Sequence, residues 1–133
     1  MKPPRVAPKV GTEAVQAKRV LDVNGKNARL RIYIGEDKRH GDLPLYEAIA
    51  LKARQLQMAG ATVARGTLGY GRSTRLHTTE VVFSEDLPII VEIVDSEERI
   101  AKFVPLLTGF EEIGLVTCDE VRVLLYPPIP CEK

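Results

Sequence analysis

The feature that most constrains the fold is a run of alternating apolar and polar side chains over residues 28–35. Successive side chains of a β-strand point to opposite faces of the sheet, so this run separates into two sets. The apolar set is Leu30, Ile32 and Ile34, and the polar set is Arg29, Arg31 and Tyr33. The run therefore predicts a strand with one buried face and one polar face.

A helix is predicted after this strand and a charged loop over residues 36–42. Pro44 fits the first turn of a helix, where its missing N–H costs no hydrogen bond. Apolar side chains then recur at helical spacing: Leu45, Ile49, Ala53 and Leu56. Gly60 is placed to end the helix in the left-handed conformation. The pattern predicts a helix over residues 44–59.

Further strands are predicted beyond this helix. Residues 62–68 are rich in β-forming side chains, and residues 77–83 are expected to extend the sheet as a flap. Residues 87–94 are nearly all apolar, which is typical of a central strand covered on both faces. Pro88 belongs at the start of that strand, because proline cannot donate a ladder hydrogen bond.

The last third of the chain repeats the helix-then-strand order. Residues 95–98 supply a capping side chain and acidic groups for a helix start. Pro105 lies within the helical pattern and is expected to kink the helix or end its regular part near Val104. Residues 120–126 are predicted to form the last strand.

These elements follow the order typical of an α+β ferredoxin-like (βαββαβ) sandwich, in which two helices lie on one face of an antiparallel sheet. Asn24-Gly25 predicts a hairpin turn and therefore an extra N-terminal strand over residues 19–23. A long loop follows the second strand. Because the apolar run 87–94 needs cover on both faces, the open sheet face is expected to pack against another subunit. The usual solution for this fold is a homotrimer with clefts between subunits.

The 133 residues are enough for one domain with a real core. We expect a flexible basic tail over residues 1–18, a domain over residues 19–126 and a proline-rich tail over residues 127–133. Residues 1–27 carry a charge of +4. They contain no dense basic block, so a solvated tail is favoured over contact with nucleic acid or anionic lipid. Only two cysteines occur, and no membrane span or signal peptide is evident, so a cytoplasmic location is expected.

Ligand-binding chemistry is concentrated in residues 60–77. The glycines permit close approach of the backbone to a ligand, and the arginines offer forked donors to a phosphate or carboxylate. The predicted ligand-binding residues are Arg65, Gly66, Gly69, Tyr70, Gly71, Arg72, Ser73, Arg75 and His77. The alternative is an exposed loop whose arginines pair with Glu80, Glu85 or a neighbouring subunit.

Other functions have less support. His77 with Ser73 or Thr78 lacks an orienting acid, so neither catalytic residues nor an enzyme is expected. Two histidines and two cysteines are the only strong metal ligands, and no metal site is predicted, although a trimer axis would multiply one histidine by three. The polar face of the first strand carries a single aromatic side chain, so no nucleic-acid partner is expected.

A set of short segments, taken in order and spacing, is more specific than any one of them. These are 30–36 (LRIYIGE), 45–49 (LYEAI), 59–63 (AGATV), 65–71 (RGTLGYG), 77–78 (HT), 84–88 (SEDLP), 92–98 (EIVDSEE) and 114–117 (GLVT). Over about residues 19–126 the chain resembles an uncharacterised prokaryotic PII-like family, domain of unknown function 190. That family is similar to the nitrogen regulatory PII signalling proteins.

The resemblance implies trimers of ferredoxin-like subunits that bind adenine nucleotides or related small molecules between subunits. It also implies a loop after the second strand that docks onto a target, often a membrane transporter or an enzyme. Members of this family look to be associated with fluoride-channel-type membrane proteins in some genomes. The chain lacks the phosphate-binding glycine-lysine loop of PII proteins and has the acidic segment 109–114 (GFEEIG) there, which leaves residues 60–77 as the candidate site.

We therefore expect a PII-like regulatory protein that binds a small anionic ligand, an adenine nucleotide, between subunits and controls a partner protein. In this hypothesis Arg65, Arg72 and Arg75 hold the anion, the glycines permit its approach, and His77 tunes the response with pH. The alternatives are a metal-binding trimer of the cation-tolerance type and a structural adaptor without a ligand.

Overall fold

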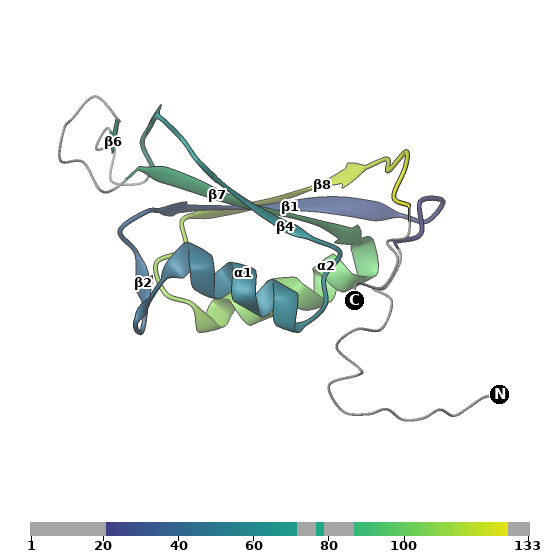
Figure 1. The fold of residues 1–133 in the computed structure, drawn as a ribbon, viewed down its shortest axis with the longest axis horizontal. Coiled ribbons are helices and arrows are strands. Elements are labelled where there is room, and N and C mark those ends of the chain that lie inside the picture. Colours follow the sequence, from purple (N-terminus) through teal and green to yellow (C-terminus); the bar gives the residue numbers. More distant parts are fainter. Residues whose placement is uncertain (1–20, 72–76, 79–86, 128–133) are drawn as a thin grey trace, which may run out of the picture.

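The computed structural model describes residues 21–71, 77–78 and 87–127. In these ranges the chain has an α+β fold, with two α-helices on one face of a four-stranded antiparallel sheet (Figure 1). The sheet order is β4-β7-β1-β8. The strands are β4 (Ala61–Arg65), β7 (Pro88–Ser96), β1 (Asn27–Gly35) and β8 (Leu115–Val121).

The helices are α1 (Leu45–Gln55) and α2 (Glu97–Phe103), and α2 continues as the 3-10 helix η2 (Val104–Gly109). Two small hairpins complete the described elements. One pairs β2 (Arg39–His40) with β3 (Leu43–Pro44), and the other pairs β5 (Leu68–Gly69) with β6 (His77–Thr78). None of the helices in the described ranges is both long and apolar enough to cross a membrane.

The two faces of β1 differ as the alternation predicts. Leu30 and Ile32 are fully buried beneath the helices, whereas Arg29, Arg31 and Tyr33 lie half-buried on the other side of the sheet. We call that side, away from the helices, the open face. The strand register extends this division into a buried and an open face to β7 and β8, because residues opposite one another in paired strands share a face.

One hydrophobic core lies between the sheet and the helix layer. Its main members are Leu30, Ile32 and Ile34 of β1, Ile89, Val91 and Ile93 of β7, Leu45, Ile49 and Ala53 of α1, and Ile100, Phe103 and Leu107 of the second helical segment. Full burial of one large aliphatic side chain stabilises a fold by about 1.5–3 kcal/mol. The core therefore fixes both helices against the two central strands.

The sheet has two distinct ends, which we name for what lies there. The loop end holds the last residues of β1 and β4 and the first residues of β7 and β8; it is on the left in Figure 1. The clasp end, on the right, holds the opposite ends of these strands and the start of α2. Leu21, the first described residue, is buried and leads into β1 at the clasp end.

The predicted end of α1 is wrong. The helix stops at Gln55 rather than near residue 59, and Gln57, not Gly60, adopts the left-handed conformation, with φ of 59°. A residue distant in sequence explains this, because the Arg99 guanidinium donates to the carbonyl oxygens of Leu56 (2.6 Å) and Gln57 (3.2 Å). These bonds satisfy acceptors that a longer helix would have used internally.

The start of α2 agrees with its sequence. Ser96 is the N-cap, and its hydroxyl accepts a hydrogen bond from the backbone N–H of Arg99 (3.2 Å). Regular helix ends at Phe103, and the segment containing Pro105 continues as η2, as the proline predicts.

Three strand predictions need correction. The last strand is 115–121, not 120–126, because β1 offers no backbone beyond Asn27 for pairing after Val121. The second strand stops at Arg65. Gly66 still donates its N–H to the Pro88 carbonyl opposite it (2.7 Å), but proline has no N–H to return the bond, so regular pairing ends there. The central strand covers residues 88–96 rather than 87–94, and within one subunit its side chains alternate between buried and half-buried.

The prediction of an extra N-terminal strand over residues 19–23 is also wrong for residues 21–23, the part that the structure describes. Residues 21–26 form no strand and contain a turn, in which the Gly25 N–H donates to the Asp22 carbonyl (3.0 Å). The Asp22 carboxylate accepts from the Asn24 N–H (3.0 Å), and the Asn27 amide donates to the Asp22 carbonyl (2.9 Å). The Asn-Gly signal thus marks a turn held by local side chains rather than a hairpin.

Candidate functional site

The loop end joins four separate chain segments through backbone hydrogen bonds. The Gly66 N–H donates to Pro88, the Glu36 N–H donates to the Leu87 carbonyl (2.9 Å), and the Gly114 N–H donates to the Tyr33 carbonyl (3.0 Å). The exits of β1 and β4 are therefore tied to the entrances of β7 and β8. Any group bound here would contact segments that are far apart in sequence.

Arg65 is the one predicted anion-binding arginine in the described ranges. Its guanidinium donates to the Glu36 carboxylate at 2.6 Å, and its side chain is 54% exposed against 20% for Glu36. The carboxylate thus holds the guanidinium at the sheet edge while leaving much of it open to solvent. An exposed pair of this kind is worth little stability and can exchange partners.

The glycines at this end serve two different purposes. A Cβ on Gly66 would lie 2.9 Å from Cγ of Pro88, and one on Gly69 would lie 3.1 Å from the same atom. A side chain at Gly66 would force a shift, and one at Gly69 would be a tight fit, because the chain folds closely over the proline ring. Gly71 has open space around it. Two of the predicted ligand-approach glycines are thus explained by packing within the chain.

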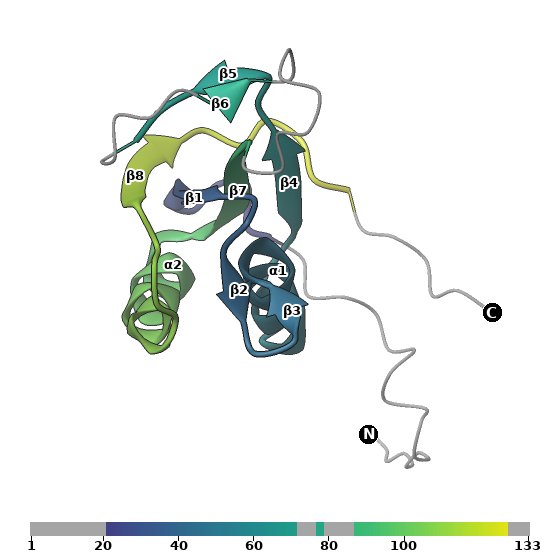
Figure 2. The same ribbon diagram turned by 90° about the vertical axis from the view of Figure 1, so that its left-hand side faces the viewer.

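The segment after β4 turns back as the β5–β6 hairpin, which pairs Leu68 with Thr78 and Gly69 with His77. Figure 2 shows this hairpin beyond the sheet, on the side away from the helices. Tyr70 follows β5 with a 69% exposed side chain, and Leu68 is also exposed. The hairpin therefore presents an aromatic and an aliphatic side chain to solvent beside Arg65.

The structure brings together five of the nine predicted site residues: Arg65, Gly66, Gly69, Tyr70 and Gly71. It places the backbone of His77 beside Gly69. Arg72, Ser73 and Arg75 lie outside the described residues, as do Glu80 and Glu85. Sequence reasoning missed Glu36 and the packing role of Pro88. The sequence could have indicated Glu36 as a site residue by its position directly after Gly35, where the most clearly predicted strand ends.

The open face carries charges that are already paired. Arg29 donates to Asp119 (2.8 Å), and Arg31 donates to Glu92 (3.0 Å). The hydrogen bond from Arg29 lowers the pKa of the Asp119 carboxyl, and the hydrogen bond to Glu92 raises the pKa of Arg31. The side chains of Arg29 and Arg31 are 32% and 36% exposed, against 54% for Arg65, so the loop-end guanidinium is the most accessible of the three to an anion.

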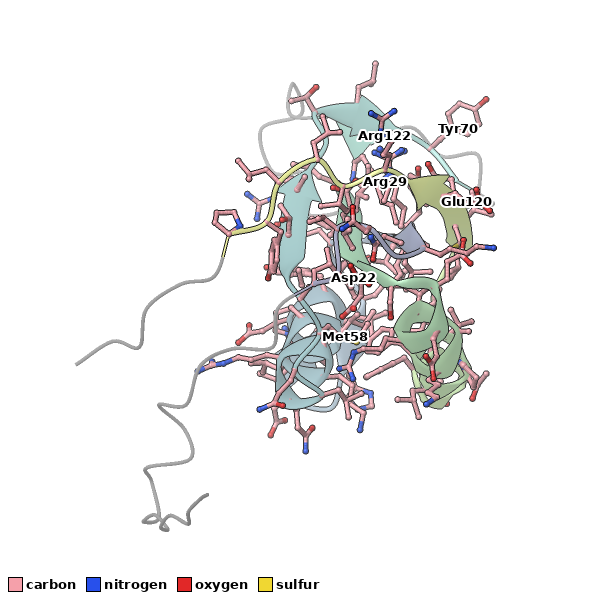
Figure 3. The ribbon with its side chains drawn as sticks, turned by 90° about the vertical axis from the view of Figure 1, so that its right-hand side faces the viewer. Asp22, Arg29, Met58, Tyr70, Glu120 and Arg122 are labelled. Atoms are coloured by element: carbon pink, nitrogen blue, oxygen red, sulfur yellow. The ribbon has the colours of Figure 1, made fainter. Side chains whose placement is uncertain are left out.

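The segment after β8 crosses the sheet at the clasp end. The Tyr126 hydroxyl donates to the Ala59 carbonyl (2.8 Å), which anchors the segment beside the start of β4. Figure 3 shows Arg122 of this segment on the same side of the sheet as Arg29. Leu124 and Leu125 are both more than three-quarters exposed. The segment thus adds exposed apolar surface beyond the end of β8.

The helix side of the molecule has a hollow of about 390 Å³ between α1 and the η2 region. His40 lines it and packs edge-on against Phe110, with ring centroids 4.7 Å apart. Over the described ranges, no three His, Cys, Asp or Glu side chains are grouped as metal ligands. Cys118 has a thiol whose pKa is raised by burial and by the nearby Asp119 and Glu97 carboxylates.

Comparison with known proteins places the chain in a family. Residues 27–123 match the family model DUF190, described as an uncharacterized ACR. A UPF0166 protein of Aquifex aeolicus is 33% identical over 100 residues, covering 74% of this chain and 94% of the relative. A UPF0166 protein of Methanocaldococcus jannaschii is 38% identical over 96 residues, covering 71% of this chain and 88% of the relative. The chain therefore belongs to the uncharacterised DUF190 (UPF0166) family.

Proposed function

We propose that the protein is a cytoplasmic PII-like regulator that catalyses no reaction. In this proposal three ferredoxin-like subunits assemble through their open faces. A small anionic ligand, an adenine nucleotide, binds at the loop end between subunits. The ligand-bound form then controls a partner protein, a membrane transporter or an enzyme.

The strand order supports the ferredoxin-like part of the proposal. One helix follows β1, another follows β7, and the order β4-β7-β1-β8 is the one that a βαββαβ chain gives in that fold. The open face supports the assembly. Ile90 and Val94 of β7 lie half-buried on that face beside Tyr33, and Leu115 of β8 is exposed there. A second subunit would cover this apolar surface.

The Arg65–Glu36 pair is the observation that carries the ligand part of the proposal. A half-exposed guanidinium lies where four chain segments meet, beside an exposed tyrosine and a projecting hairpin. A phosphate offers the guanidinium a bidentate partner stronger than a single carboxylate oxygen. The anion would replace Glu36 on Arg65 and thereby alter the loop end. Such a difference in affinity between two conformations shifts their populations.

Calorimetric titration of the full chain with ATP, ADP, AMP and cyclic nucleotides, with and without Mg²⁺, tests the proposal. We expect one nucleotide to bind and the variant Arg65→Gln to lose about tenfold in affinity. Arg54→Gln is the matched control, because Arg54 is exposed on α1, one residue from its clasp-end terminus. Absence of binding by every nucleotide would overturn the ligand assignment, and a monomeric mass by light scattering would overturn the trimer.

A further inference from the structure

An apolar groove runs between α2 and β8, on the helix side of the sheet. Its volume is about 490 Å³. Its apolar lining comes from Ala28, Ile100, Ala101, Val104, Pro105 and Cys118. Acidic residues stand at its rim, with Glu97 from α2 and Glu120 from β8. Figure 3 shows Glu120 on β8 above α2. The groove is thus apolar inside and negatively charged at its edge.

The strand beside the groove is an edge of the sheet. In the order β4-β7-β1-β8, β8 pairs with β1 alone among the described strands. Its outer side therefore presents backbone N–H and C=O groups that an additional extended segment can bind. The small side chains of Ala28 and Ala101 leave room beneath such a segment for alanine or valine side chains.

The rim favours a basic occupant. Over the described ranges, Glu97 and Glu120 form no ion pair, whereas Glu98 pairs with Lys102 and Asp119 pairs with Arg29. No lysine or arginine lines the groove. Two carboxylates beside an apolar floor leave a negative potential that a positively charged peptide would neutralise.

The chain itself contains a segment with the complementary chemistry. Residues 1–20 carry five basic side chains against one acidic one, Glu13. Residues 9–20 contain no proline, so they can form a full ladder, and their apolar residues are all alanine or valine. Extended, these twelve residues reach roughly 40 Å, against about 23 Å for the length of β8.

The point of attachment also fits. Residue 20 precedes the buried Leu21 at the clasp end, where the Glu97 N–H donates to the Lys26 carbonyl (2.9 Å). The excess length allows the segment to pass around the start of α2 and still follow β8. We propose that residues 1–20 dock into the groove between α2 and β8 of their own chain, as a basic cover for this edge of the sheet.

Hydrogen–deuterium exchange of the full chain tests this docking. The first variant replaces the five basic residues of the tail by glutamine; they are Lys2, Arg5, Lys9, Lys18 and Arg19. The second variant is Glu97→Gln with Glu120→Gln. In each variant we expect amides of residues 115–121 to exchange about fivefold faster than in the unmodified chain, while residues 89–93 are unchanged. Raising the salt from about 50 to about 500 mM should have the same effect.

Glu98→Gln is the matched control, because its carboxylate lies on the same helix but is paired with Lys102 outside the groove. It should leave the exchange of residues 115–121 unaltered. Equal exchange of these amides in the unmodified chain and both variants would overturn the proposal. Protection that is lost on dilution would also overturn it, since that result assigns the groove to a second copy. The outcome does not depend on whether any nucleotide binds at the loop end.

Discussion

The two ends of the sheet are fastened in opposite ways. At the clasp end, the fully buried carboxylate of Asp95 accepts hydrogen bonds from the N–H groups of Ala59 (2.9 Å) and Ser96 (2.7 Å). It also forms an ion pair with the Arg99 guanidinium (3.4 Å). The same guanidinium donates a hydrogen bond to the Leu56 carbonyl at the end of α1. At the loop end, Arg65 of β4 is tied to Glu36, which follows β1, and this pair is more exposed than Asp95.

This difference separates stability from function. A buried carboxylate that satisfies several donors is costly to disturb, because each donor left behind loses its partner away from water. An exposed pair costs little to exchange for a ligand. The clasp end therefore fixes the positions of α1, β4, β7 and α2, and in the proposed function the loop end is the part of the same sheet that responds to a bound anion.

Removing the Asp95 carboxylate at the clasp end should have the largest effect on stability. Asp95→Ala leaves the N–H groups of Ala59 and Ser96 without their acceptor and the Arg99 charge without its partner. We expect a loss of about 3 kcal/mol in the free energy of unfolding, measured by urea denaturation. Asp95→Asn keeps one acceptor and should lose less. A loss below about 1 kcal/mol for the alanine variant would show that the clasp end is not the fixed end.

Crowding the loop end should have an intermediate effect. Gly66→Ala places a Cβ 2.9 Å from the Pro88 ring, so the chain must shift there, at a cost of about 1–2 kcal/mol in unfolding free energy. Gly71→Ala is the control, because its Cβ would meet open space, and it should stay within about 0.5 kcal/mol. Equal values for the two variants would contradict the close packing over Pro88.

Freeing Arg65 should change binding more than stability. Glu36→Gln removes the carboxylate that competes with an anion for the guanidinium. We expect the free energy of unfolding to fall by less than about 1 kcal/mol and nucleotide affinity to rise about threefold, measured by denaturation and calorimetry. A weaker affinity would mean that Glu36 supports the ligand instead of competing with it.

The smallest effect concerns the open face. The hydrogen bond from Arg29 lowers the pKa of Asp119 below its ordinary 3.8, so the pair stabilises the fold above that value. The stabilisation is lost as the pH falls through the lowered pKa, because the carboxyl then takes up a proton. In the variant Arg29→Gln, carbon NMR of the Asp119 carboxyl should show a pKa closer to 3.8 than in the unmodified chain. An unchanged titration would contradict the pairing.

Much of the fold follows from local pattern. The alternation over residues 28–35 predicts which side of β1 meets the helices, and Ser96 with the acids after it predicts the start of α2. These features depend on residues close in sequence. The end of α1 does not, because it is set by Arg99, which lies more than forty residues further along the chain. The position of β8 is likewise set by the length of β1, its partner.

The candidate site was predictable only in part. The glycines and arginines of residues 60–77 indicate that the backbone packs closely against another group and that a cationic side chain binds an anionic partner. They do not say that Gly66 and Gly69 approach Pro88, or that Arg65 is paired with Glu36. Each of these partners comes from another strand end, and the sheet register alone brings them together.

Nuclear magnetic resonance of the labelled full chain during titration with each nucleotide observes both ends of the sheet at once, so it can show which end binds the ligand. We expect chemical-shift changes at the Arg65 side chain and at the amides of Gly66, Gly69 and Tyr70, with the Ala59 and Ser96 amides of the clasp end unchanged. Shifts confined to the clasp end, or none at any residue with any of the nucleotides, would contradict the assignment of the loop end as the responsive, ligand-binding part of this protein.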